Sequence, residues 1–288
     1  MPRHTLLVLA AAAGCAHAPP IDRAIETTLP AAASRAPLTR EPRVVTFNLH
    51  GVRGDLVANA IRSDPALRDA DVFVFEEVHG HGGCSTACEV ARALGYHAVY
   101  APEFADHHGK DDRDGSDGVA IVSRAPIDSA QVIELPYYNV HLNDERRKAA
   151  LAATIRQGAG VVTIYAVHLT NRLSVRQRRA QMMPVIAHAL AQHTPVIIAG
   201  DFNISPFTWI GHLIPIPTGT QDDRFEQLMR AHGFATPTEH SGATSRFLGM
   251  KLDGIYTRGF RTRDTAVAEA LDVSDHMALW AELVAETP

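Results

Sequence analysis

Residues 195–203 read PVIIAGDFN, so a short apolar stretch runs directly into a carboxylate and an amide. Asp201 and Asn203 are two positions apart, and side chains at this spacing on a strand point to the same side. Carboxylate and amide oxygens are the ligands that a hard cation such as Mg²⁺ prefers. The stretch therefore predicts a buried strand that delivers two oxygen-bearing side chains to one place.

Other apolar stretches also end in polar residues. VVTF is followed by Asn48, VFVF by Glu76 and Glu77, and VTIYAV by His168, while Asp253 lies in KLDGIYT and Asp275 and His276 open the last stretch. Taken singly, such a residue is explained as a turn former, a cap or a hydrogen-bonded core histidine. Their repetition favours one shared polar site.

The spacing of the apolar residues predicts many strands and a few helices. Strands are expected at residues 44–48, 72–76, 97–101, 119–123, 131–135, 149–155, 161–168, 196–199, 252–257 and 277–283, and helices at 56–62, 87–94, 174–192 and 222–232. Ser174 and Gln177 should form a capping box, and Pro184 should kink or split the third helix. We expect two stacked sheets flanked by helices.

Length and charge limit the number of hydrophobic cores and the kind of ligand that the chain can bind. A chain of 288 residues with 46% hydrophobic content can bury one large core or two smaller ones. The formal net charge of -5 disfavours extensive nonspecific binding to nucleic acid, so such a contact would need a local patch. We expect a monomer.

Seven motifs occur along the chain in one order: FNLHG, DVFVFEEV, GVAIVSR, YAVHLTN, IIAGDFN, KLDGIYT and SDHMALW. From about Arg43 to Leu283 the chain thereby resembles the endonuclease/exonuclease/phosphatase superfamily and is similar to deoxyribonuclease-I-like proteins. The resemblance implies an α/β fold, a four-layered α/β/β/α sandwich of two packed mixed sheets with the site at one rim. It also implies a metal-dependent phosphoric ester hydrolase.

The resemblance assigns roles to the polar residues. It places the metal, Mg²⁺ or alternatively Mn²⁺, at Asn48, Glu77 and Asp275, and the catalytic groups at His168, Asp201, Asn203, Asp253 and His276. Within this set, Asp253 would orient His276 for acid–base work, and Asp117 would be the partner of His168. Asn203 would also bind phosphate, together with Arg147 or, equally by sequence, Arg146. Glu76 stands where such proteins frequently have glutamine.

The expected reaction is hydrolysis of a phosphodiester by metal-assisted, in-line attack of water. Nucleic acid is the first substrate hypothesis, a phospholipid head group is the alternative, and a noncatalytic binding protein on the same fold is the third. The chain lacks the tryptophan-rich signature of inositol-polyphosphate phosphatases. His50 and His79 replace, respectively, an aspartate of abasic-site endonucleases and an arginine of pancreatic-type deoxyribonucleases, so the substrate is not assigned.

Three smaller features complete the domain. Cys84 and Cys88 can form a local disulfide in an oxidising compartment, and a zinc site with His79 and His81 is disfavoured because no second cysteine pair exists. Residues 105–118 match a calcium-loop pattern only in part, which favours a solvated loop. Residues 204–220 are apolar for a loop and are expected either to contact substrate as a flap or to cover the sheet.

Residues 1–18 predict an export signal, because Arg3 precedes an apolar run too short to span a bilayer. The sequence AAGC at residues 12–15 resembles a bacterial lipoprotein box, whereas AHA at residues 16–18 fits ordinary secretion. We expect a lipid on Cys15 that anchors the protein in the bacterial cell envelope, with secretion as the alternative. Residues 19–42 would be a flexible tether, and residues 43–288 the catalytic domain.

Metabolic labelling with palmitate checks the anchor. We expect the wild-type protein to carry label and Cys15→Ala to lose it, because the thiol is the site of lipid attachment. An unlabelled, soluble wild-type protein that begins at Pro19 would contradict lipidation.

Overall fold

The computed structural model describes residues 24–106, 115–140, 147–219 and 221–286. The predicted export signal, Cys15, Arg146 and most of the calcium-like loop lie outside the described residues, so their assignments stay predictions. None of the described helices is long and apolar enough to cross a membrane.

Two mixed sheets form the centre of the domain. One has seven strands in the order β1-β4-β5-β3-β2-β14-β13, and the other has five in the order β12-β9-β8-β7-β6. The seven are β1 (Glu26–Thr28), β2 (Arg43–Asn48), β3 (Val72–Gly80), β4 (His97–Asp106), β5 (Gly115–Ser123), β13 (Phe260–Ala268) and β14 (Ala278–Ala285). The five are β6 (Ile127–Glu134), β7 (Ala149–Gln157), β8 (Gly160–His168), β9 (Val196–Asp201) and β12 (Asp253–Arg258).

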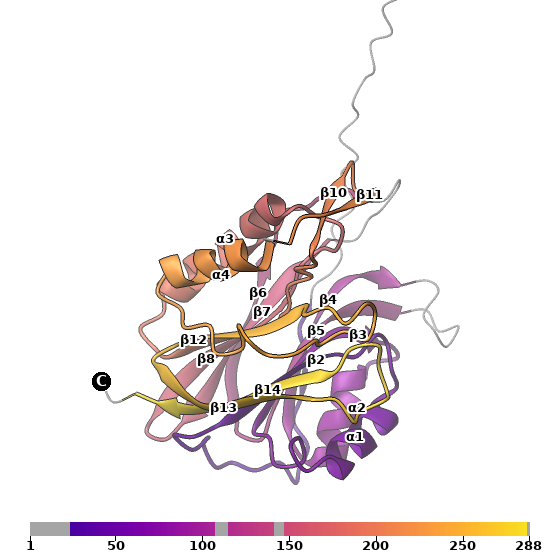
Figure 1. Ribbon diagram of the computed structural model, residues 1–288. Coiled ribbons are helices and arrows are strands. Elements are labelled where there is room, and N and C mark those ends of the chain that lie inside the picture. Colours follow the sequence, from indigo (N-terminus) through magenta and orange to yellow (C-terminus); the bar gives the residue numbers. More distant parts are fainter. Residues whose placement is uncertain (1–23, 107–114, 141–146, 220, 287–288) are drawn as a thin grey trace, which may run out of the picture.

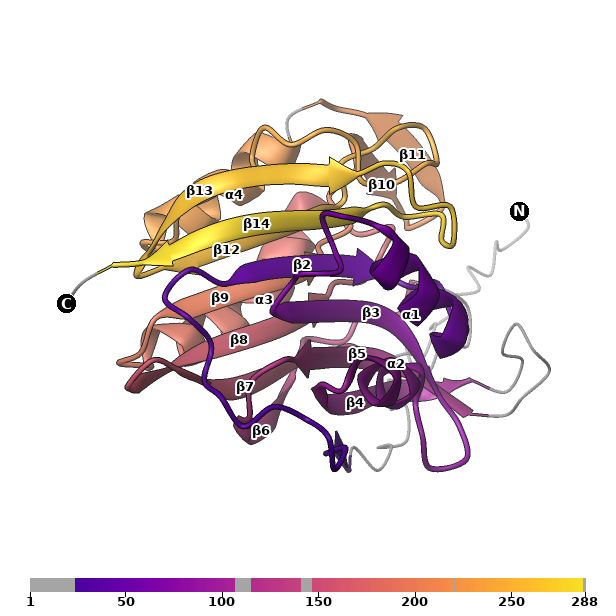
Figure 2. The same cartoon turned by 90° about the horizontal axis from the view of Figure 1, so that it is seen from below.

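Helices cover the outer face of each sheet. Helices α1 (Gly54–Ser63) and α2 (Thr86–Leu94) lie on one side of the paired sheets, and α3 (Val175–Leu190) and α4 (Gln221–Ala231) lie on the opposite side (Figure 1). Seen from below, the seven-stranded sheet lies in front of the five-stranded sheet (Figure 2). The predicted four-layered α/β/β/α sandwich is confirmed.

Three hydrophobic clusters hold these layers together. One packs Val57 and Val90 of the first pair of helices against the seven-stranded sheet, and another packs Val185 and Phe225 of the second pair against the five-stranded sheet. The third lies between the sheets. Every central strand therefore buries both faces, which explains why these strands read as continuous apolar runs.

The crossover connections explain where two of the helices occur. Strands β2 and β3 are parallel, as are β8 and β9, and a parallel pair needs a long connection over one face of the sheet. Helices α1 and α3 lie within these two connections. Helix α3 begins with the predicted capping box of Ser174 and Gln177, but it runs unbroken through Pro184, so the expected split does not occur.

All ten predicted strands and all four predicted helices are present, and four strands were not predicted. Strand β13 was missed because it is an edge strand whose residues are mostly exposed and polar, so it carries little apolar periodicity. Strands β10 (Phe207–Ile210) and β11 (Ile214–Pro217) form a separate hairpin from the apolar loop, and the fourth is β1. Cys84 and Cys88 form the predicted disulfide, with Cα atoms 5.3 Å apart.

The segment expected to be a flexible tether is part of the domain from at least Glu26. Strand β1 pairs with β4, and the Glu26 carboxylate accepts hydrogen bonds from the backbone and hydroxyl of Ser85. Leu38 is 3% exposed and packs into the cluster between the sheets. The prediction of a domain boundary at Arg43 was wrong because one buried leucine and three paired residues give no periodic signal in an Ala- and Pro-rich stretch.

Leu38→Ala tests this boundary. We expect the free energy of unfolding to fall by about 2–4 kcal/mol, because truncating a buried leucine loses apolar contact and leaves a cavity. The matched control is Leu29→Ala, since Leu29 is 69% exposed and its loss should change stability by less than about 0.5 kcal/mol. Chemical denaturation measures both variants, and equal stability of the two would contradict the packing of this segment.

Candidate active site

Most of the predicted site residues gather around one cavity at a rim of the paired sheets. The cavity has a volume of about 560 Å³, and its lining includes Glu77, His168, Asp201, Asn203, Asp275 and His276. Asn48 and Asp253 lie behind this lining, hydrogen-bonded to residues that form it. The structure thus brings together side chains that are more than 200 positions apart in the sequence.

Strand alternation explains why these side chains meet. In β9, Ile197 and Ala199 belong to the cluster between the sheets, and Asp201 is the next residue on the same face. In β8, Ile164 and Ala166 lead in the same way to His168. Rows of apolar side chains between the sheets therefore continue into polar side chains at the rim.

The same alternation of side chains places a polar residue at the end of a strand in the seven-stranded sheet. In β2, Val44 lies between the sheets, and two steps of two residues lead to Asn48. The Asn48 amide donates to Asp201 Oδ2 across the sheets at 3.0 Å. This contact joins the polar ends of the two sheets directly.

Asp201 and Asn203 do not share a face by strand alternation, contrary to the sequence prediction. Strand β9 ends at Asp201, and Asn203 takes a left-handed conformation with φ of 52°. The Asn203 backbone donates to Asp201 Oδ1 at 2.8 Å, and the Asn203 amide donates to the Leu169 carbonyl at 2.9 Å. A turn closed by these bonds brings both side chains to the cavity.

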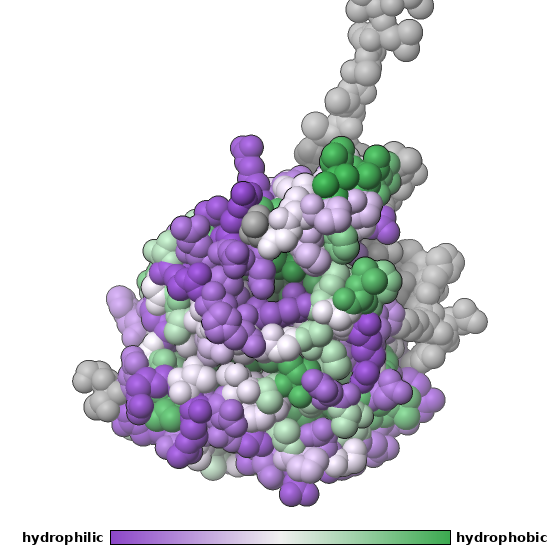
Figure 3. All heavy atoms as spheres, in the orientation of Figure 1, coloured by the Kyte–Doolittle hydropathy of each residue, from purple (hydrophilic) through white to green (hydrophobic). Residues whose placement is uncertain are grey.

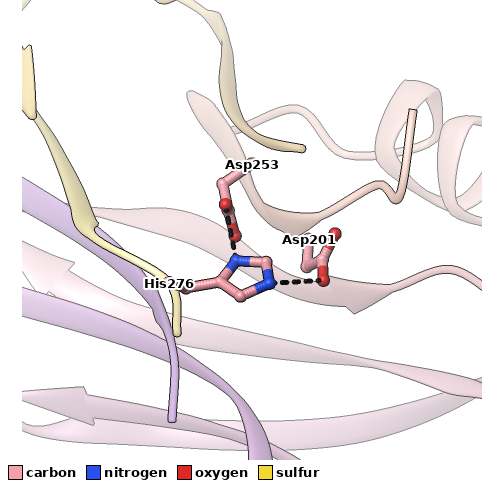
Figure 4. Close-up of side chains that lie close together, drawn as sticks. All are labelled: Asp201, Asp253 and His276. Atoms are coloured by element: carbon pink, nitrogen blue, oxygen red, sulfur yellow. Dashed lines mark hydrogen bonds and ion pairs between the residues drawn. The ribbon is translucent and has the colours of Figure 1, made fainter. Parts of the chain in front are cut away.

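His276 and Asp253 form the predicted pair. His276 Nδ1 lies 2.9 Å from Asp253 Oδ2, and His276 Nε2 lies 3.9 Å from Asp201 Oδ2 (Figure 4). Burial lowers the pKa of His276, but the carboxylates of Asp253, Asp201 and Asp275 together outweigh burial and raise that pKa to about 10. The Asp253 carboxylate fixes the ring orientation, and the charged imidazole can donate a proton or a hydrogen bond to a phosphoryl group.

Two groups of residues could hold a cation. Ligand atoms of Asp201, Asp253 and His276 lie within 4.8 Å of one another, but the hydrogen bond between Asp253 and His276 already occupies one atom of each. The other group is the predicted set of Asn48, Glu77 and Asp275. We favour this second group, because the carboxylates of Glu77 and Asp275 both line the cavity, whereas Asp253 lies behind the lining and is hydrogen-bonded to His276.

His50 shows that the two carboxylates of the second group converge on one point. Its Nδ1 lies 3.1 Å from Glu77 Oε2 and 3.5 Å from Asp275 Oδ1, so both carboxylates face one point. Asn48 is within hydrogen-bond distance of Glu77, at 3.1 Å from Oε1. Two carboxylates and a nearby amide are a donor set suited to Mg²⁺, which keeps several water ligands.

The partner of His168 differs from the prediction. Lys148 Nζ lies 2.7 Å from His168 Nδ1, and Glu103 Oε2 lies 3.7 Å from the same nitrogen. Lys148 also donates to Glu103 at 3.0 Å. Glu103 therefore takes the place expected for Asp117, which lines the cavity and whose pKa burial raises to about 7.

Arg147 does not line the cavity, although it was predicted to contact phosphate. Its guanidinium lies over the Tyr137 ring, 5.8 Å from the centroid, whereas the adjacent Lys148 lines the cavity. Neighbouring residues of an extended chain point to opposite sides, so only one of the two can face inward. The inward cation is Lys148, and a charged residue directly before the buried stretch AALAATI was the signal that could have identified it.

Glu76 is a fully buried acid beneath the site. Its side chain is fully buried, and the Thr46 hydroxyl donates to Oε1 at 2.9 Å. Burial first, and then the charges of Asp253 and Asp201, raise the pKa of Glu76 well above its usual range. The raised pKa favours the protonated form of Glu76, which has the shape and the neutrality of glutamine.

The backbone is strained at several of these positions. Among the described residues, His50, Glu77 and Asn203 have φ values of 49°, 50° and 52°. A non-glycine residue in this region costs free energy and persists only where the surroundings hold it in place. Here the hydrogen bonds among the polar side chains hold the strained residues, so the site geometry is set before substrate binds.

Comparison with known proteins agrees with this geometry. The model of the Endonuclease/Exonuclease/phosphatase family matches residues 45–276. No curated protein sequence matches the chain. A solved endonuclease/exonuclease/phosphatase from Beutenbergia cavernae is similar over 86% of this chain and 72% of its own, with a TM-score of 0.68 and 20% identity.

Two further solved structures share the fold. The human nocturnin catalytic domain, solved with a bound sulfate anion, covers 87% of this chain and 97% of its own with a TM-score of 0.59 and 17% identity. ANGEL2, a 2′,3′-cyclic phosphatase solved with adenosine-2′,3′-vanadate, covers 93% and 100% with a TM-score of 0.61 and 15% identity. The chain belongs to the Endonuclease/Exonuclease/phosphatase family, whose members are metal-dependent phosphoric ester hydrolases.

Lys148→Met tests the buried network around His168. We expect the free energy of unfolding to fall by about 3–5 kcal/mol, because the Glu103 carboxylate would remain buried without its cation. Adding Glu103→Gln should restore part of the loss, since the amide oxygen still accepts from the Ala149 backbone and no charge remains.

The control is Arg156→Met, which removes an exposed ion pair with Asp128 and should cost less than about 1 kcal/mol. Urea denaturation of the four proteins decides the question. A Lys148→Met protein as stable as the Arg156→Met protein would show that the buried pair does not contribute.

Proposed function

We propose that this protein is a phosphodiesterase that uses a divalent cation, Mg²⁺ being the first candidate and Mn²⁺ the second. The observation that carries the proposal is the hydrogen-bonded pair of Asp253 and His276 in the same site as the carboxylates of Glu77 and Asp275. A noncatalytic protein on the same fold has no need to keep an oriented histidine and two convergent carboxylates together in one cavity.

Each group of the site has a distinct task in this proposal. Glu77 and Asp275 would hold the cation, which would supply charge stabilisation to the phosphoryl oxygens. Asp201 orients the attacking water and takes up its proton, while Asn203 donates a hydrogen bond to phosphate. His276 supplies a proton or a hydrogen bond to the reacting phosphoryl group, because Asp253 holds its ring in one orientation.

Nucleic acid is the first substrate candidate. Phe104, Trp209 and Phe247 line the cavity, and the Arg172 guanidinium lies 5.6 Å from the Trp209 ring centroid. Aromatic and guanidinium surfaces stack on nucleobases. The sulfate bound by nocturnin supports an oxyanion ligand, and the adenosine-2′,3′-vanadate bound by ANGEL2 supports a phosphoester with a nucleoside group.

A phospholipid head group is the second candidate, favoured by the hairpin of β10 and β11. Ile210, Leu213, Ile214 and Ile216 are between 40% and 74% exposed, and hydrophobic atoms gather at the top of the molecule where this hairpin projects (Figures 1 and 3). Trp209 of the same hairpin lines the cavity. Of the two roles expected for residues 204–220, this position favours a flap that contacts substrate over a cover for the sheet. An exposed apolar hairpin beside a site suits a lipid surface.

The test is hydrolysis of bis(p-nitrophenyl) phosphate with Mg²⁺ by wild type, His276→Ala, Asp253→Asn and the double mutant. We expect each single change to lower turnover by about 10²- to 10⁴-fold. The double mutant should lose far less than the product of the two losses, because the two residues act as one unit. Full multiplicativity would disprove the pair, and a wild-type protein inactive with every divalent cation would disprove the function.

A substrate panel then separates the two candidates. Single-stranded DNA, RNA and sphingomyelin vesicles are incubated with Mg²⁺, and products are separated by size or by phase. Preferential release of nucleotides supports the nuclease, whereas release of phosphocholine supports the phospholipid alternative and contradicts the first candidate.

A further inference from the structure

Arg178 is a buried cation on the wall of the cavity that none of the roles above uses. It lies in the first turn of α3, lines the cavity and is 1% exposed. Two nitrogens of its guanidinium, Nε and Nη1, are buried and have no hydrogen-bond partner among the described residues. A guanidinium carries five N–H donors, so most of its capacity is unused.

By contrast, the side chains of Gln181 and Arg258 have hydrogen-bond partners. Gln181, one turn further along α3, donates to the Pro136 carbonyl and the Thr170 hydroxyl, both at 2.9 Å, and accepts from the Thr170 backbone at 3.0 Å. Arg258 is only partly buried, yet it donates to two backbone carbonyls at 2.9 Å. The two buried nitrogens of Arg178 thus contrast with the polar atoms of Gln181 and Arg258, which have hydrogen-bond partners.

The surroundings of Arg178 leave its charge largely uncompensated. Burial lowers the pKa of Arg178 to about 10, and the Asp201 carboxylate opposes this effect only in part. Asp201 itself interacts with His168, His276 and Asn48, so its charge is shared among several groups. A buried charge without partners costs much free energy, and an anion that enters the cavity would remove that cost.

We propose that Arg178 binds the phosphoryl group of the substrate through its unpartnered N–H donors. The guanidinium presents planar, paired donors that match the oxygens of a phosphate, and a cavity wall is the place from which it can reach one. A metal ion is excluded as the ligand of Arg178, because the guanidinium and the ion are both positively charged. This inference rests on the proposed function for the substrate but concerns a binding site that can be measured without turnover.

The experiment is calorimetric titration of inorganic phosphate into protein that is kept free of metal with a chelator. Arg178→Met removes the charge and keeps much of the side-chain volume, and Arg178→Lys keeps the charge but loses the paired donors. The matched control is Arg179→Met, because Arg179 is the exposed neighbour on the same helix. Sodium chloride at equal ionic strength controls for screening.

We expect phosphate affinity to fall at least about tenfold in Arg178→Met and by a smaller factor in Arg178→Lys, while Arg179→Met matches the wild type. In the Mg²⁺-dependent diester assay, KM should rise in the two Arg178 variants. A folded Arg178→Met protein with wild-type phosphate affinity overturns the proposal. If thermal melting shows that Arg178→Met does not fold, Arg178→Lys decides, and unchanged affinity in that variant overturns the proposal as well.

The two proposals fail in different ways. A protein that hydrolyses no phosphodiester but loses phosphate binding in the Arg178 variants refutes the function and keeps the anion site. Normal diester hydrolysis with unchanged phosphate binding in those variants refutes the anion site alone.

Discussion

The packing of one sheet against the other is the constraint on which the site depends. Side chains between the sheets come from every second residue of each strand, and most of them are small or branched apolar groups. Toward one rim the same rows change from apolar to polar, as in the step from Ala199 to Asp201 and from Ala166 to His168. The apolar rows hold the strands in register, and the register sets where each polar side chain stands.

The charges at this rim stabilise one another in a small, mostly buried space. Asp253 pairs with His276, and Glu103 with Lys148, so each buried carboxylate of these pairs has its own cation. Glu76 has no such partner, and its raised pKa favours the neutral form. Because isolated buried charges are costly, these pairings stabilise the buried carboxylates of Asp253 and Glu103 while Glu77 and Asp275 remain open to the cavity.

Catalytic and recognition features come from different parts of the chain. The groups that would do chemistry stand at the ends of strands within the two sheets, where packing holds them in place. The aromatic and apolar groups around them come largely from connections, such as Trp209 in the β10 and β11 hairpin and Phe247 before β12. Loops can change without disturbing the core, which is why one family of sandwiches serves many phosphoester substrates.

The sequence by itself determined the strands that carry strong apolar periodicity, the four helices, the capping box of α3 and most residues of the site. These features are local, because an apolar run and the polar residue that ends it can be read from adjacent positions. It did not reveal β13, whose polar edge carries no such pattern, or the start of the domain, where Leu38 is a single buried anchor.

Only the tertiary structure decided which side chains meet. The choice of Glu103 over Asp117 beside His168, and of Lys148 over Arg147 in the cavity, depends on which side of a strand or loop faces inward. The same holds for His50 between Glu77 and Asp275 and for the unpartnered guanidinium of Arg178. Contacts between segments far apart in sequence follow from sheet register and helix packing, and no local pattern encodes them.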